Sequence, residues 1–164
     1  MTFKLTRFNS RILNALFFLV SLCLLGIVKA AEICDDIIYE VLDDETRNKD
    51  FSNPYCVNQN REDCDIGYWG ADWKGPNWYK IEGKAGTRIA DTLVEKCHCN
   101  TDATGYIIGT HPTRVGETVE RTVCFSWIND PCRLSKTIQI RNCGNYYLYY
   151  LEETIACNCR YCTQ

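Results

Sequence analysis

The 164-residue chain carries 18 basic residues, 21 acidic residues and 12 cysteines. This acidic balance excludes nucleic-acid binding, which needs a basic patch that displaces counterions from phosphates. The length is enough for one domain and is short for two.

The first thirty residues have the layout of a signal peptide. Three basic residues precede an almost unbroken apolar run from Ile12 to Val28, and the small residue Ala30 follows. We expect cleavage after Ala30; an uncleaved membrane anchor is the alternative, because the run approaches the length that spans a bilayer. Cleavage leaves 14 basic against 21 acidic residues, a net charge of −7. No second apolar run of that length follows, so we expect a secreted, extracellular product that does not contact a membrane.

The residues that follow, 31–77, are polar and rich in turn-forming residues. Acids gather between Glu40 and Asp50, and glycines and a proline interrupt the stretch between Gly67 and Pro76. We expect a loosely structured N-terminal arm around a hairpin. Residues 87–96 then offer the one candidate for a helix, because Ile89 and Leu93 share a face at helical spacing.

From Trp78 onward the chain is strand-like, with β-branched and aromatic residues in short runs bounded by Gly, Pro and Asn. We predict sheet segments at 118–125, 137–141 and 146–151. The predicted fold class is therefore all-β: a small disulfide-rich β module with one short helix and an N-terminal hairpin arm.

Eleven cysteines remain after cleavage, because Cys23 lies inside the signal. In an exported chain of this size they predict a disulfide framework, in which each bridge contributes about 2 to 4 kcal/mol. The sequence leaves the pairing open. An odd number leaves at least one thiol that is free, capped, or shared between two chains in a disulfide-linked homodimer. The framework consists of Cys34, Cys56, Cys64, Cys97, Cys99, Cys124, Cys132, Cys143, Cys157, Cys159 and Cys162.

The sequence contains no constellation typical of an enzyme. Its two histidines are His98, between two cysteines, and His111, before a proline. A cysteine nucleophile needs a neighbouring base and a thiol kept out of disulfides, which an exported framework disfavours. No motif singles out a pair of carboxylates for glycoside hydrolysis. We expect no enzymatic activity, no catalytic residue and no cofactor.

Two stretches resemble metal sites. Residues 97–99, with Cys157, Cys159 and Cys162, would supply zinc ligands in a reducing compartment, but oxidation removes those thiolates. Residues 100–111 resemble a calcium loop, except that its last position is His111 where a bidentate glutamate belongs. We expect disulfides at the first stretch and no metal at either.

Aromatic residues are the other informative group, because their rings stack on sugars and anchor protein partners. We expect Trp78 and alternate tyrosines of the C-terminal run to lie in the core. Trp69 and Trp73, which sit among glycines, are left open. The tyrosines are Tyr146, Tyr147, Tyr149 and Tyr150.

An ordered series of motifs identifies a known family. The series runs through Trp78-Tyr79-Lys80-Ile81, Gly109-Thr110-His111-Pro112, Gly116-Glu117, Arg121-Thr122-Val123-Cys124, Ile138-Gln139-Ile140-Arg141-Asn142-Cys143, Tyr146-Tyr147 and Tyr161-Cys162. It resembles the eight-cysteine extracellular domain of uromodulin, the pancreatic secretory granule membrane major glycoprotein and oncoprotein-induced transcript 3 protein. The resemblance divides the chain into a signal peptide at 1–30, an arm with a hairpin at 31–77 and the domain at 78–164. The sequence ends two residues after Cys162, and we expect this module alone.

The chain departs from the family at the position that carries a functional glycan. In uromodulin-like members the domain presents a high-mannose glycan to mannose-binding fimbrial lectins. The asparagine that bears it would precede Gly109-Thr110, where this chain has Ile108, and no Asn-x-Ser/Thr sequon occurs anywhere. We expect no N-glycosylation and do not carry the decoy mechanism over.

The cysteine pattern departs from the family as well. Leu93 stands where the resemblance places the first core cysteine, and we expect Cys97 to take over its role. Cys56 and Cys159 are additional, and either is a candidate for a bridge between two chains.

These observations predict a secreted, non-enzymatic module that binds an extracellular protein or glycan through loops and exposed aromatic residues. One alternative is an acidic structural component of an extracellular or mineralised matrix, suggested by the charge and the acids at 40–50. A venom or defence effector is another, because small exported cysteine-rich chains also serve there. The sequence does not identify the ligand-binding residues.

Overall fold

The computed structural model describes residues 33–53, 63–67 and 72–164, which belong to one unit that begins at Ile33. The predicted signal peptide, Cys56 and Trp69 lie outside the described residues. Among the helical segments in those ranges, none has the length and hydrophobicity needed to span a bilayer. The elements are β1 (Glu40–Leu42), the 3₁₀ turn η1 (Glu45–Arg47), β2 (Asn77–Ile81), the 3₁₀ turn η2 (Gly83–Ala85), β3 (Ala103–Ile107), β4 (Thr118–Trp127), β5 (Asp130–Asn142), β6 (Tyr147–Leu151) and β7 (Cys159–Tyr161).

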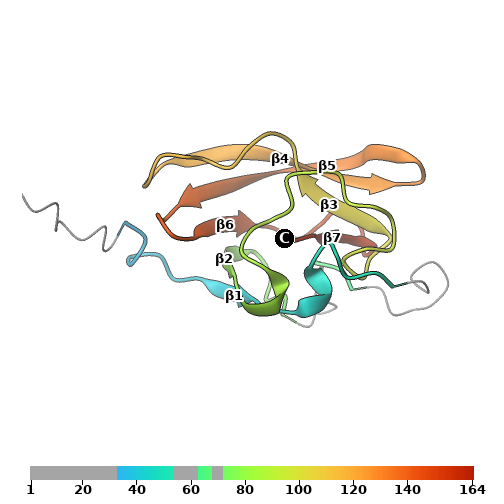
Figure 1. Cartoon of the computed structure of the whole chain (residues 1–164), viewed down its shortest axis with the longest axis horizontal. Coiled ribbons are helices and arrows are strands. Elements are labelled where there is room, and N and C mark those ends of the chain that lie inside the picture. The colour runs from blue at the N-terminus through green and yellow to red at the C-terminus, as the bar shows by residue number, and fades with distance from the viewer. Residues whose placement is uncertain (1–32, 54–62, 68–71) are drawn as a thin grey trace, which may run out of the picture. The chain divides into compact units, whose positions relative to one another are not determined.

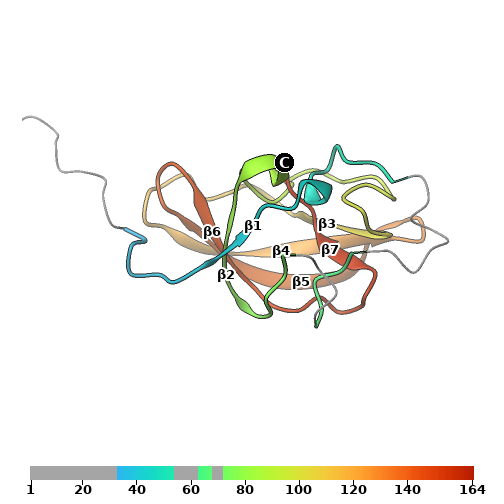
Figure 2. The same cartoon turned by 90° about the horizontal axis from the view of Figure 1, so that it is seen from below.

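The strands form one seven-stranded sheet in the order β1-β2-β6-β5-β4-β3-β7 (Figure 1). The two pairs at the sheet edges, β1 with β2 and β3 with β7, are parallel, and the inner pairs are antiparallel. The predicted all-β, disulfide-rich module is confirmed. The sheet curls until its edges meet, because Asn48 after η1 pairs with Thr163 after β7. Figures 1 and 2 both place the C-terminus close to the 3₁₀ turns.

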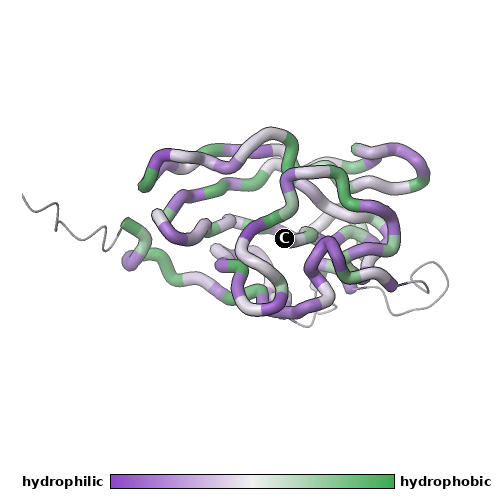
Figure 3. Tube along the Cα trace, in the orientation of Figure 1, coloured by the Kyte–Doolittle hydropathy of each residue, from purple (hydrophilic) through white to green (hydrophobic). Residues whose placement is uncertain are grey.

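The predicted strands at 118–125, 137–141 and 146–151 are present as parts of β4, β5 and β6. They form strands because their side chains alternate between two faces of the sheet. The inward face is apolar, and alternation of hydrophilic and hydrophobic residues is visible along the β4–β5 hairpin in Figure 3. The main core comprises, among others, Leu42, Trp73, Tyr79, Ile81, Val123, Phe125, Ile138, Ile140, Tyr149, Leu151 and Tyr161.

β4 and β5 are joined by a two-residue turn, since Trp127 pairs with Asp130. Both turn residues have positive φ, 50° at Ile128 and 61° at Asn129. This is the conformation that matches the twist of a tight hairpin, and asparagine or glycine adopts it far more easily than a β-branched residue. The turn is therefore strained at Ile128, whose side chain is 59% exposed.

The predicted helix at 87–96 is wrong. Ile89 forms an antiparallel bridge with Thr163, and the amide of Ala90 donates to the carbonyl of Cys162. The carbonyl of Ala90 accepts from the amide of Ile107. The backbone amide and carbonyl of Ala90, which a helix would pair within itself, thus bind the C-terminal segment and the end of β3. This tertiary pairing overrides the weak helical periodicity. Of the described residues, only the 3₁₀ turns η1 and η2 are helical.

The arm is not loosely structured where the structure describes it. Its described residues, 33–53, 63–67 and 72–77, contain β1, which lies parallel to β2, and η1, and the hairpin within the arm stays a prediction. Two disulfides, Cys34–Cys143 and Cys64–Cys157, join the arm to the strands that follow. The bridged cysteines are 109 and 93 residues apart in the sequence, so both bridges strongly restrict the unfolded chain.

Candidate functional site

The face of the sheet opposite the core carries a cluster of aromatic rings. In β2 the side chains of Tyr79 and Ile81 point into the core, so Trp78 and Lys80 point outward. In β6 the same alternation sends Tyr149 inward and Tyr150 outward. Trp78 and Tyr150 pair directly across the two strands. We call the outward group of Tyr39, Trp78, Lys80, Tyr146 and Tyr150 the aromatic face.

The rings of this face contact one another in pairs. Trp78 and Tyr150 meet edge to face, with ring centroids 5.6 Å apart at 64°. Tyr39 approaches Tyr146 at 6.4 Å, and the Nζ atom of Lys80 lies 5.2 Å from the Tyr146 ring centroid, within cation–π range. All five side chains are partly accessible. Such a surface offers rigid area for stacking at a small cost in side-chain entropy.

Two charged groups set the electrostatics of this face. Lys80 Nζ lies 2.7 Å from a carboxylate oxygen of Glu82, and this hydrogen bond raises the pKa of Lys80. Burial, followed by the nearby Tyr39 and Asp35, raises the pKa of Tyr146. Lys80 is therefore charged and Tyr146 neutral at physiological pH, and the lysine charge is already compensated within the protein.

The N-terminal segment covers one end of the face. Cys34 is bonded to Cys143, and both pack on Leu148 together with Ile33, Ile37 and three aromatic residues of the face, Tyr39, Trp78 and Tyr146. Arg141 fixes this segment further, since its Nη2 donates to the carbonyl of Ile33 at 2.7 Å. The segment ends at Ile38, which is 86% exposed. The aromatic face is thus built jointly by the arm and the strands.

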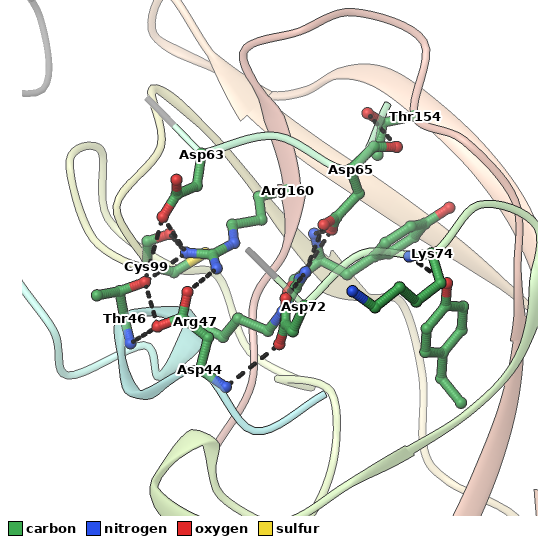
Figure 4. Close-up of polar contacts among 12 residues, drawn as sticks. Asp44, Thr46, Arg47, Asp63, Asp65, Asp72, Lys74, Cys99, Thr154 and Arg160 are labelled. Carbon is green, nitrogen blue, oxygen red and sulfur yellow. Dashed lines mark hydrogen bonds and ion pairs between the residues drawn. The ribbon is translucent and has the colours of Figure 1, made fainter. Parts of the chain in front are cut away.

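A buried ion network fills the region where the sheet edges meet (Figure 4). Arg47 is fully buried, and its guanidinium binds two carboxylates in a bidentate manner. Its Nη2 lies 2.6 Å from oxygens of both Asp65 and Asp72. Asp65 also accepts from the Tyr161 amide at 2.8 Å, so one carboxylate joins the arm to β7.

Arg160, the second fully buried arginine, completes the network from β7. Its Nη2 donates to Asp44 at 2.9 Å, and its Nη1 donates to the Thr46 hydroxyl at 2.8 Å and lies 3.2 Å from Asp63. Figure 4 shows Asp44, Thr46 and Asp63 converging on this guanidinium. Since Asp44 also caps η1 by accepting from the Thr46 amide, the network fixes the turn that follows β1.

The charges of this network perturb one another. Burial by itself would lower the pKa of Arg47, but the charges and hydrogen bonds of Asp65 and Asp72 outweigh it and raise that pKa. Burial would raise the pKa of Asp72, and Arg47 outweighs burial and holds it below its ordinary value. Burial and then the charge of Arg47 lower the pKa of Arg160. The contacts of both guanidinium groups lie within the protein, although the Nε atom of Arg160 is buried without a partner, so the network is a structural brace.

The predicted cysteine framework is largely paired in the structure. Besides the two bridges of the arm, Cys99 is bonded to Cys162 and Cys124 to Cys132. Cys97 also takes part in a disulfide. Cys159 is a free thiol and is completely buried, and burial raises its pKa to about 11. A buried, protonated thiol cannot reach another chain. The prediction that Cys159 could form an intermolecular bridge is therefore wrong.

The structure contradicts both metal alternatives. The zinc alternative fails because Cys97, Cys99, Cys157 and Cys162 are in disulfides. The calcium alternative fails because the stretch at 100–111 runs into β3 and its polar groups are used elsewhere: Asp102 accepts from the Trp127 indole at 2.8 Å. No group of metal-binding side chains occurs among the described residues.

The two histidines have structural contacts. His98 Nδ1 lies 2.5 Å from the carbonyl oxygen of Lys49. His111 is buried, its Nε2 lies 3.0 Å from the Tyr149 hydroxyl, and burial lowers its pKa. Neither contact involves a cysteine, so the geometry assembles no nucleophile and base from them.

The remaining aromatic predictions divide between the two faces of the sheet. Tyr149 lies in the core as expected, and Trp73, which the sequence left open, is buried and stacks on Tyr79 with centroids 5.0 Å apart. Trp78 is not in the main core, against expectation, because its place in β2 turns it toward the outward face. Nothing in the sequence indicated that Tyr39 and Lys80 would join it, since their proximity arises from the β1–β2 and β2–β6 pairings.

Comparison with known proteins agrees with the fold. The family model for the uromodulin-like eight-cysteine domain matches residues 79–163. The chain belongs to this family. It is 34% identical to mouse (Mus musculus) uromodulin over 134 residues, which are 80% of this chain and 19% of the relative. It is 39% identical over 87 residues to the dog (Canis lupus familiaris) pancreatic secretory granule membrane major glycoprotein GP2, covering 52% of this chain and 17% of the relative.

The human (Homo sapiens) GP2 glycoprotein is 36% identical over 98 residues, 59% of this chain and 18% of the relative. This uromodulin-like chain therefore spans about a fifth of the length of the curated relatives it matches. It shares with them a secreted, extracellular setting and the character of a disulfide-bonded extracellular module.

Proposed function

We propose that this uromodulin-like chain is a non-enzymatic binding module that recognises an extracellular protein or glycan through its aromatic face. The observation that carries the proposal is the outward cluster of Trp78, Tyr150, Tyr39 and Tyr146 on a braced sheet. Rings held this way are pre-organised, so a ligand that stacks on them loses little free energy to ordering of the protein. Aromatic residues are also the side chains most enriched where binding energy concentrates.

A non-enzymatic role is supported by the state of the reactive groups. The free thiol of Cys159 is buried with a pKa of about 11, and the histidines are used as structural contacts. The buried carboxylates of Asp65 and Asp72 are both ion-paired with Arg47. None of these groups is presented to a substrate.

The matrix alternative loses support from the ion pairs of the acidic stretch. Asp44 binds Arg160, Glu45 binds Lys84 at 2.7 Å, and Asp50 lies 3.3 Å from Lys49. Asp44 is thereby withdrawn from any calcium or mineral site, whereas the pairs of Glu45 and Asp50 are exposed and weak. The stretch at 40–50 acts as part of the fold, and its charge is partly compensated.

The test is a binding screen with the secreted, oxidised protein. We would probe it against an array of glycans and a panel of extracellular proteins, beside Trp78→Ala and Tyr150→Ala. Ile128→Asn, at the tip of the β4–β5 hairpin, serves as the control. We expect at least one ligand whose binding is lost in both aromatic variants and kept in the control. Absence of any ligand, or binding that neither aromatic variant weakens, would refute the proposal.

A further inference from the structure

Four outward side chains lie in one row across the middle of the sheet. Trp78 of β2 pairs with Tyr150 of β6, Tyr150 pairs with Gln139 of β5, and Gln139 pairs with Glu120 of β4. Because each pairing is directly across the ladder, the four side chains follow one line perpendicular to the strands. We call these four residues the cross-strand row.

The row changes character along its length. Trp78 and Tyr150 are half-buried aromatic rings, whereas Gln139 and Glu120 are exposed. Neither the Gln139 amide nor the Glu120 carboxylate has a hydrogen-bond or ion-pair partner in residues 33–53, 63–67 and 72–164. With neighbouring strands about 4.8 Å apart, the row extends over roughly 14 Å. That length fits two or three linked sugar rings better than a single small molecule.

The order of groups suits a saccharide. The apolar face of a pyranose packs on an aromatic ring. Its hydroxyl groups donate hydrogen bonds to a carboxylate or an amide oxygen, and they accept hydrogen bonds from an amide NH2 group. Hydroxyl groups of the protein flank the row, since Thr122 and Thr137 pair directly beside it and are both exposed. A surface of rings, amide, carboxylate and hydroxyls offers contacts to every face of a sugar.

The charges around the row favour an uncharged ligand. Glu120 is the charged member of the row, Glu82 lies beside Lys80, and Asp35 is close enough to Tyr146 to affect its pKa. Lys80 is paired with Glu82, whereas Arg141 donates to the neutral carbonyl of Ile33 and keeps its positive charge. The three acids outnumber the two cations by one charge, so a sialylated or sulfated sugar would meet a net negative charge around the row.

We infer that the cross-strand row binds a neutral oligosaccharide of two or three sugar units, with its rings on Trp78 and Tyr150 and its hydroxyls on Gln139 and Glu120. This inference rests on the proposed function and names the class of ligand for the same face. An extracellular protein as the ligand of this face is the competing outcome.

The test is a titration of the secreted protein, observed by NMR, with neutral and acidic probes. The neutral probes are lactose, mannotriose and chitotriose, and the acidic probe is sialyllactose. We expect at least one neutral probe to shift the Trp78 indole and Gln139 side-chain amide resonances. Trp78→Ala and Gln139→Leu should each weaken that binding about tenfold, the equivalent of about 1.4 kcal/mol. Glu120→Gln should improve binding of sialyllactose relative to the neutral probe.

The matched control is Thr113→Ala, an exposed residue outside the sheet, which should leave the titration unchanged. Stronger binding of sialyllactose than of every neutral probe would overturn the inference. So would the absence of any saccharide response. In that case, capture of an extracellular protein that depends on Trp78 would leave the proposed function standing, whereas failure of both assays would remove both.

Discussion

Replacing Arg47 with methionine should destabilise the protein severely. Arg47 is fully buried and is the shared cation of Asp65 and Asp72, which are 0% and 8% exposed. Methionine fills a similar volume but leaves two carboxylates buried without a cation. Removing one partner from a buried ionic group costs about 3 to 5 kcal/mol. For a domain of this size, that lowers the melting temperature by roughly 10 to 20 °C.

The measurement is thermal unfolding of the oxidised protein at neutral pH, followed by circular dichroism. Lys84→Met is the control, because Lys84 forms an exposed ion pair with Glu45 and such pairs contribute little. Adding Asp65→Asn and Asp72→Asn to Arg47→Met should recover part of the lost stability, since neutral partners no longer carry buried charge. An Arg47→Met variant that melts within a degree or two of the Lys84→Met control would refute the reasoning.

The same network gives a pH dependence with a defined sign. Despite the burial that opposes it, the pKa of Asp72 is held below its ordinary value by Arg47, and the pKa of Asp44 is lowered by Thr46 and Arg160. Their folded-state pKa values lie below the unfolded ones, so their stabilisation is complete above about pH 4 and is lost as the pH falls further. The melting temperatures of the wild type and Asp72→Asn should therefore converge in acid. A difference that stays constant from neutral pH down to about pH 2 to 3 would contradict this.

Three further predictions concern single positions. Cys159 is buried and its pKa is raised, so its thiol should resist thiol reagents in the folded protein and react after unfolding. The Cys159→Ser substitution should leave the oligomeric state unchanged. Rapid labelling of the thiol in the folded protein would contradict its burial. Ile108→Asn creates an Asn-Gly-Thr sequon at a residue that is 48% exposed, so expression in a eukaryotic secretory host should add one N-glycan. The glycan would be seen as an increase in mass that a glycosidase removes. A secreted variant of unchanged mass would show that the site is inaccessible. Ile128→Asn should raise the melting temperature, because asparagine adopts the left-handed backbone conformation of this position with about 1 kcal/mol less strain than a β-branched residue. A lower melting temperature would mean that the Ile128 side chain makes a stabilising contact.

The sequence by itself determined the fold class and the longer strands. Alternating apolar and polar residues at 118–125 and 137–141 specify a strand with one buried face, whatever its partners, because the period of two is local. The density of cysteines in an exported chain likewise predicted a braced module. Local pattern is sufficient for properties that depend on neighbouring residues, and it also supported the family resemblance through Trp78, His111 and Cys162.

Tertiary structure decided which side chains meet. Arg47 lies in a polar stretch of the arm and Arg160 lies in β7. From the sequence alone, charged side chains are expected in solvent, yet both arginines are fully buried. Their burial is tolerable because carboxylates distant in the sequence surround them once the sheet edges meet. The wrong helix at 87–96 has the same origin, since Ala90 pairs with backbone groups at 107 and 162.

The candidate site depends on the same kind of long-range information. The sequence contained the aromatic residues but did not show that Trp78 and Tyr150 face outward side by side, or that Gln139 and Glu120 continue their row. Strand order and register create that row, and both are fixed by the packing of the whole core and by disulfides whose partners lie far apart in the chain. The residue types that could form such a site are given by the sequence. Their arrangement in a row exists only after residues from separate strands have been brought into register.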